Sequence, residues 1–108
     1  MAELNHAQLT RMIWIDARLV GAGRINRSDL KQAFGISMQQ AALDLRSYGA
    51  LHPGRLAYSR REKCYRPAAQ SRPKFDTGTR IRVAHAVAVI AAQRSALISE
   101  QQQEARHG

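Results

Sequence analysis

A tight turn that leads into a polar helix, over residues 35–48, constrains the fold of this chain more than any other feature. Gly35 supplies the turn, Ile36 can plug a hydrophobic core, and Ser37 stands where a helix N-cap is preferred. In the segment that follows, apolar or aromatic residues recur at i, i+4 and i+7, which predicts one buried helix face. The residues of that face are Ala41, Leu45 and Tyr48.

A short basic segment follows this helix at once. Gly49 ends the helix and Pro53-Gly54 turns the chain. Alternation of apolar and polar residues over 56–58 and 64–66 predicts two short strands, joined by the charged turn 59–63. A helix with a polar outer face that is followed by a basic hairpin has the geometry of a winged helix-turn-helix. This fold places the polar helix in the major groove of DNA.

Two further helices are predicted ahead of the turn. Residues 4–20 carry apolar side chains at three- and four-residue spacing, with Asp16 as an exception on the apolar stripe. After the helix-breaking run 21–23, Asn26 or Ser28 can cap a second helix. The residues of this second helix that we expect to face the core are Leu30, Ala33 and Phe34.

The C-terminal third of the chain has a different composition and carries a short heptad-like seam. Once the three helices and the hairpin are packed together, we expect no core of the same chain to remain for this seam to face. Pairing with a second copy of the chain would then bury the seam. Trp14 or Ile15, off the main stripe of the first helix, could join this dimer interface. The alternative is a helix folded back on its own domain. The seam consists of Val83, Val87, Ile90 and Leu97.

These elements predict a mainly α fold with a small β-hairpin. We expect a winged helix-turn-helix DNA-binding domain over residues 1–70 and a C-terminal dimerisation helix over residues 76–105. The stretch 67–73, which begins and ends with proline, has the composition of a linker.

The positive charge of the chain is concentrated. There are 17 Lys and Arg residues against 8 Asp and Glu, a formal net charge of +9. The segment 18–74 holds twelve basic and three acidic residues, so it accounts for the whole excess. Nucleic acid is therefore the first partner to consider, ahead of an anionic membrane. No stretch approaches the roughly 20 apolar residues of a spanning helix, so we expect no membrane partner.

Cysteine and histidine usage argues against a metal site or a catalytic centre. A lone Cys64 excludes an internal disulfide and a cysteine-rich zinc site. The four histidines are scattered, and no phosphate-binding loop or dinucleotide fingerprint is present. The first six residues have neither a basic region nor an apolar region, so we expect no export signal. We expect no metal, no cofactor, no enzymatic activity and a cytoplasmic, nucleoid-associated location.

Five short segments carry a resemblance to a known family: Ile25-Asn26-Arg27-Ser28-Asp29-Leu30, Phe34-Gly35-Ile36-Ser37, Asp44-Leu45, Leu56-Ala57-Tyr58 and Lys63-Cys64-Tyr65. Together they resemble the N-terminal winged helix-turn-helix of bacterial WYL-domain transcriptional regulators, itself similar to the DeoR-type DNA-binding domain. The resemblance implies operator binding as a homodimer, usually with repression of a nearby promoter.

Regulators of that family continue into a ligand-sensing WYL domain, for which we expect no room in 108 residues. The sensing of a nucleotide or another small ligand is therefore not carried over to this chain, in which no small-molecule ligand is evident. Short stand-alone regulators of this kind resemble those of phages and bacterial mobile elements, sometimes beside defence systems.

The outer face of the polar helix provides the candidates for reading DNA bases. Gln can pair with N6 and N7 of adenine, Arg with O6 and N7 of guanine, and Leu can contact a thymine methyl group. A solvated helix face would explain the polar residues but not an outward Leu43. The candidate base-contacting residues are Gln39, Gln40, Leu43, Arg46 and Ser47.

Residues around this helix are candidates for phosphate contacts. The turn 59–63 is basic enough to lie on phosphate or to enter a minor groove. The N-terminus of the polar helix can bind phosphate through its backbone N–H groups. The candidate phosphate-contacting residues are Arg27, Lys31, Ser37, Met38, Arg55, Arg60, Arg61 and Lys63.

Three neighbouring residues are expected to have structural roles. Tyr58 and Tyr65 should pack the hairpin on the core, with stacking on unpaired bases as the alternative for a single-stranded target. Asp44 should form an ion pair.

The function that these observations favour is sequence-specific binding of double-stranded DNA by a transcriptional regulator. We expect a homodimeric repressor that binds an inverted-repeat operator. Two alternatives stay open: an RNA- or ribosome-binding winged-helix protein, and a protein-interaction adaptor whose basic face meets an acidic partner.

Overall fold

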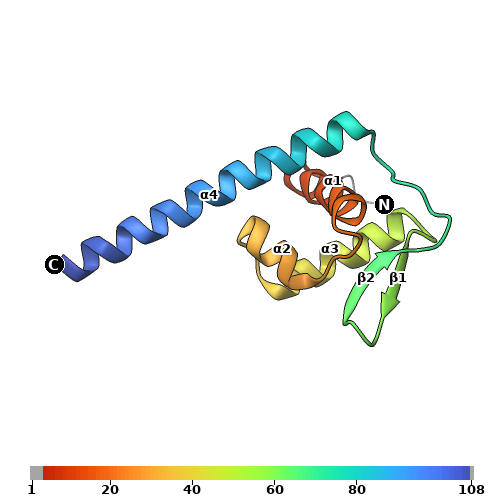
Figure 1. The fold of residues 1–108 in the computed structure, drawn as a ribbon, viewed down its shortest axis with the longest axis horizontal. Coiled ribbons are helices and arrows are strands. Elements are labelled where there is room, and N and C mark those ends of the chain that lie inside the picture. The colour runs from red at the N-terminus through yellow and green to blue at the C-terminus, as the bar shows by residue number, and fades with distance from the viewer. Residues whose placement is uncertain (1–3, 108) are drawn as a thin grey trace.

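A computed structural model describes residues 4–107 and the side chains of residues 4–103 (Figure 1). The first three helices and the hairpin lie together at one end of the molecule. A long last helix runs across them and projects beyond (Figure 1). This arrangement confirms the predicted mainly α fold with a small β-hairpin. In chain order the elements are α1 (His6–Gly21), α2 (Arg27–Phe34), α3 (Met38–Leu51), β1 (Leu56–Ser59), β2 (Cys64–Pro67) and α4 (Thr77–His107).

The boundaries of the first three helices follow from local capping chemistry. The side chain of Asn5 accepts a hydrogen bond from the backbone N–H of Gln8 and so caps α1. Asn26 caps α2 in the same way, and Ser37 caps α3, as the sequence predicted. Between α2 and α3 the backbone of Gly35 adopts the left-handed conformation, with φ at 67°. A side chain at this position would strain the turn.

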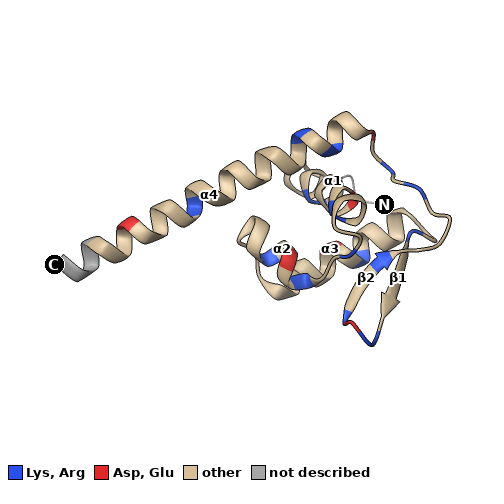
Figure 2. Cartoon of the chain, viewed as in Figure 1, with Lys and Arg blue, Asp and Glu red and all other residues tan. Residues whose placement is uncertain are grey.

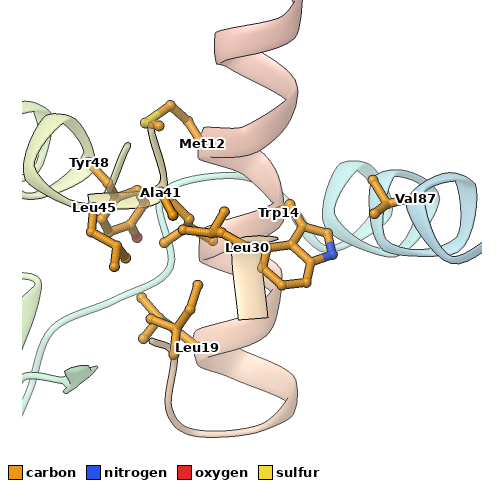
Figure 3. Close-up of a cluster of buried hydrophobic side chains, with 10 residues drawn as sticks. Met12, Trp14, Leu19, Leu30, Ala41, Leu45, Tyr48 and Val87 are labelled. Atoms are coloured by element: carbon orange, nitrogen blue, oxygen red, sulfur yellow. The ribbon is translucent and has the colours of Figure 1, made fainter. Parts of the chain in front are cut away.

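The hydrophobic core lies where α1, α2 and α3 meet, and Figure 3 shows its side chains converging from these helices. The predicted inner face of α3 is confirmed, since Ala41, Leu45 and Tyr48 are all buried. Trp14 and Ile15 are also buried, so the prediction that one of them joins a dimer interface is wrong. The Trp14 ring instead meets Phe34 edge to face, with 5.5 Å between the ring centroids.

A buried polar cluster explains the acidic residue on the apolar stripe of α1. The Tyr48 hydroxyl donates a hydrogen bond to Asp16 Oδ1 at 2.5 Å. The backbone N–H groups of Lys74 and Phe75 donate to Asp16 Oδ2, each at 2.9 Å. Asp16 thereby fastens the segment before α4 onto the core. All of these donors are remote from Asp16 in sequence, so its burial could not be read from the helical pattern.

Arg55 belongs to the same cluster, which corrects a prediction. Arg55 is only 2% exposed, and its guanidinium donates to the Tyr48 hydroxyl at 3.3 Å and to Ser71 Oγ at 2.9 Å. Its Nε also lies 3.7 Å from Asp16 Oδ1. A guanidinium enclosed in this way cannot reach a DNA phosphate, so the predicted phosphate contact of Arg55 is wrong.

The hairpin is antiparallel, with Tyr58 directly opposite Tyr65. A further bridge joins Ile25 to Tyr65, which fixes the hairpin to the chain before α2. Tyr65 packs partly against the core, as predicted. Tyr58 does not: it is 55% exposed and covers the ring of Tyr65, with 5.0 Å between the two centroids.

The first half of α4 packs on its own winged domain. Val87 is only 7% exposed and belongs to the core, and Val83 packs beside it. The prediction that these two residues lack a core in their own chain is therefore wrong. Arg94 donates hydrogen bonds to the backbone carbonyls of Gln32 and Ala33, at the C-terminus of α2. A cation at this end of a helix also complements the helix dipole.

The second half of the predicted seam stays exposed: Ile90 is 65% exposed and Leu97 is 59% exposed. Within Thr77–Gln103 an 18-residue window has a mean hydropathy of 1.3, so by length and composition this helix could cross a membrane, which differs from the sequence-based expectation. One such helix is weak evidence for a membrane, because core helices of soluble proteins have the same properties. Here the contacts of Val87 and Arg94 make this helix part of the winged domain.

Candidate nucleic-acid interface

The outer face of α3 is open to solvent and points away from the core. Gln39, Leu43, Arg46 and Ser47 are all exposed, as their helical positions predicted. Leu43 has 48% of its surface accessible, although burial of a leucine is normally favourable. An apolar side chain between polar ones on an exposed helix face suits a DNA base edge that carries a methyl group.

Gln40 differs from its neighbours on this helix. It is half-buried, and its Nε2 donates a hydrogen bond to Asp44 Oδ1 at 3.0 Å. Arg11 Nε donates to the other oxygen of Asp44 at 2.7 Å. The predicted ion pair of Asp44 is confirmed, whereas its tie to Gln40 was missed. The spacing of i to i+4 between the two residues was the available signal.

A groove of about 400 Å³ separates α3 from the hairpin. The hairpin is the wing of the fold, and its turn, residues 59–63, is the wing turn. The groove is lined by three cations, Arg27 from α2, Arg46 from α3 and Lys63 from the wing turn. The rings of Tyr58 and Tyr65 form part of its wall. Three cations from three elements around one groove create a site of positive potential, which attracts a phosphate backbone.

The turn of the wing presents further positive charge. Arg60, Arg61 and Lys63 are exposed. Glu62, the one acid in the turn, forms ion pairs with Arg66, through Nε at 3.2 Å, and with Arg24 at 3.9 Å. The hydrogen bond from Arg66 lowers the pKa of Glu62, so this carboxylate stays ionised. Its charge is offset by partners outside the turn.

The N-terminus of α3 and the exposed side of α2 extend the same basic surface. Arg27 and Lys31 are exposed and stand one turn apart on α2. Ser37 and Met38 are exposed at the start of α3, where the helix dipole is positive. Figure 2 shows Lys and Arg along α2, α3 and the hairpin, whereas the projecting part of α4 carries few charges.

Within the described side chains, residues 4–103, no three His, Cys, Asp or Glu residues come together in a way that could hold a metal ion. The exposed face presents hydrogen-bonding side chains and positive charge. Its hydrogen-bond donors, acceptors and cations suit a polyanion whose base edges offer hydrogen-bonding groups better than a small-molecule substrate.

The comparisons with known proteins agree with this geometry. A family model described as the BrxR transcriptional regulator winged helix-turn-helix domain matches residues 7–89. Over 72 residues the chain is 42% identical to the DNA-binding transcriptional repressor CapW of Escherichia coli (strain KTE188), covering 67% of this chain and 24% of the relative.

Two relatives of the same name are similarly close. The chain is 40% identical over 72 residues to CapW of Stenotrophomonas maltophilia, covering 67% of this chain and 24% of the relative. It is 41% identical over 68 residues to CapW of Pseudomonas aeruginosa, covering 63% of this chain and 23% of the relative. The chain thus spans less than a quarter of the length of these relatives.

These relatives are named as DNA-binding transcriptional repressors, which is not an enzymatic role and agrees with the expectation of no catalytic activity. The matched region contains α2, α3 and the hairpin, which form the exposed basic face. The chain belongs to the family of BrxR transcriptional regulator winged helix-turn-helix domains.

Proposed function

We propose that this chain binds double-stranded DNA in a sequence-specific manner and represses transcription as a homodimer on an inverted-repeat operator. One observation carries the proposal: the exposed polar face of α3 stands beside a groove lined by Arg27, Arg46 and Lys63. Support also comes from the relatives, whose names describe DNA-binding transcriptional repressors. This role places the protein in the cytoplasm, on the nucleoid.

In this proposal α3 enters the major groove and the surrounding cations hold the phosphates. The residues of α3 that contact base edges in this proposal are Gln39, Gln40, Leu43, Arg46 and Ser47. The groove between α3 and the wing takes one strand of the sugar–phosphate backbone. The turn residues Arg60 and Arg61 reach the backbone or the adjacent minor groove.

The proposed dimer forms through the part of α4 that the winged domain leaves uncovered. Its exposed apolar residues there are Val89, Ile90, Leu97 and Ile98. A second copy would bury this surface, and two recognition helices would then reach half-sites about 34 Å apart on one face of the DNA. Arg94 lies between these residues in sequence, but its side chain is bonded to α2 of its own chain and is therefore not part of the proposed dimer surface.

The test is competition binding at several salt concentrations. Labelled genomic DNA fragments are retained by the protein in the presence of excess random duplex or excess structured RNA. We expect a subset of the labelled fragments to stay bound to the protein in the presence of excess random duplex. Equal displacement of every fragment by random duplex would contradict sequence-specific binding.

A second candidate function is binding of structured RNA, favoured by one observation. Tyr58 is exposed on the wing, and an exposed aromatic ring can stack on an unpaired base. In the same experiment this function predicts that structured RNA displaces DNA at equimolar amounts. Tyr58→Leu would then weaken RNA binding more than DNA binding, because only an unpaired base can stack on the ring.

A further inference from the structure

The amide of Gln40 is held by a buried carboxylate. Asp44 lies one turn later on α3 and is almost inaccessible to solvent. One of its oxygens accepts a hydrogen bond from Gln40 Nε2, and the other accepts one from Arg11 Nε. Because Arg11 belongs to α1, the carboxylate is fixed from two different helices.

The chemistry of this pair determines which end of the amide faces Asp44. A glutamine amide has a donor NH₂ end and an acceptor oxygen end of nearly equal size, and half a turn exchanges them. A carboxylate accepts hydrogen bonds but cannot donate them, so the NH₂ end must face it. The Oε1 atom of Gln40 consequently faces away from Asp44, and the pair uses one of the two N–H groups.

This orientation matters because the two purines present different edges in the major groove. Adenine offers an acceptor, N7, beside a donor, the N6 amino group, whereas guanine offers two acceptors, N7 and O6. An amide that presents an oxygen together with one N–H is complementary to adenine. Bidentate pairing with guanine needs two N–H donors, and one of those on Gln40 is engaged by Asp44.

We propose that Asp44 is a positioning residue that holds the amide of Gln40 in the orientation that reads adenine and rejects guanine. Arg11 keeps the carboxylate in place from α1. The inference rests on the proposed function, because it requires α3 to lie in the major groove of a specific site. Gln39, exposed and outside this pair, provides the matched control.

The test measures base preference at each operator position for four proteins: unaltered, Gln40→Ala, Asp44→Asn and Gln39→Ala. Dissociation constants are determined on duplexes in which each base pair of the selected operator is replaced in turn. Gln40→Ala identifies the base pair that Gln40 reads, through loss of an adenine preference there. Asp44→Asn should reduce the adenine-over-guanine preference at that same pair roughly tenfold, since its amide can donate to Oε1 and allow the flipped orientation.

Gln39→Ala should leave the preference at that pair unchanged. The double variant Gln40→Ala/Asp44→Asn separates positioning from support of the fold. If Asp44 acts through Gln40, the double variant has the same base preferences as Gln40→Ala alone. Equal losses on adenine and guanine duplexes with Asp44→Asn would overturn the proposal, because they indicate a structural role only.

Failure of the inference and failure of the proposed function give different results. An operator that the unaltered protein selects, with no base preference changed by Gln40→Ala, overturns the inference and leaves the function standing. Absence of any sequence preference in the unaltered protein overturns both.

A second measurement does not depend on whether a variant of Asp44 folds, because it uses the unaltered protein. In ¹H–¹⁵N spectra of the unaltered protein, the side-chain amide of Gln40 should exchange with water far more slowly than that of Gln39. The two signals are assigned from their disappearance in Gln40→Ala and Gln39→Ala. Equal exchange rates would show that the pair with Asp44 does not hold the amide, and the proposal would be abandoned.

Discussion

Removal of the two arginines at the turn of the wing should flatten the salt dependence of DNA binding. Arg60 and Arg61 are exposed, whereas Arg66 and Arg24 of the same region already pair with Glu62. The double variant therefore removes two of the three exposed cations of each wing turn, which makes four in a dimer. At about 0.9 units per phosphate, the slope of log K against log salt should shrink by about 3–4 units in Arg60→Ala/Arg61→Ala.

The assay is fluorescence anisotropy on an operator duplex between 50 and 200 mM salt. Over this range the affinity of the unaltered protein should fall by a factor roughly 100 times larger than the factor for the variant. Arg82→Ala is the control. Arg82 is exposed near the start of α4, and Figure 2 shows that end of α4 well apart from the hairpin. An unchanged slope in the double variant would remove the wing from the interface. A change of about 2 units would mean that one wing binds in each complex.

Three further predictions concern the dimer and the core. Ile90→Glu/Leu97→Glu should give folded monomers with weakened operator binding, because both side chains are exposed on α4. This prediction would be contradicted if the unaltered protein sedimented as a monomer at micromolar concentration without DNA. Val87→Ala should cost about 2 kcal/mol of unfolding free energy in urea, and Ile90→Ala almost nothing. Tyr48→Phe should cost about 1–3 kcal/mol by leaving Asp16 Oδ1 without its donor. Burial raises the pKa of Tyr48 above its ordinary value of 10.0, so the stability that its protonated hydroxyl contributes should be fully present below pH 10 and be lost as the pH rises above it. Tyr48→Phe should therefore lose less stability at high pH.

The local features of the fold could be predicted from the sequence because they depend on neighbouring residues. Asn26 and Ser37 cap their helices through backbone groups three residues away, and the periodicity of α3 alone placed Ala41 and Tyr48 inside. Leu43 was correctly expected outside on the same grounds.

The errors arose where the partner of a residue is remote in sequence. The stripe that contains Val87 has the same pattern whether it packs on α1 or on a second copy, so periodicity could not decide between them. Arg55 was counted as surface charge because its partners, Tyr48 and Ser71, are brought to it only by the tertiary fold. The tie between Gln40 and Asp44 depends on burial, which is a property of the packed domain.

Selection of bound duplexes from a random DNA pool by the purified chain tests the central claim most directly. A homodimeric repressor that uses α3 in this way should enrich an inverted repeat whose half-site centres lie about 10–10.5 base pairs apart, with two chains bound to each duplex. Mass measurement of the complex gives the number of chains. A pool that stays random after repeated rounds, or a single half-site held by one chain, would contradict the account.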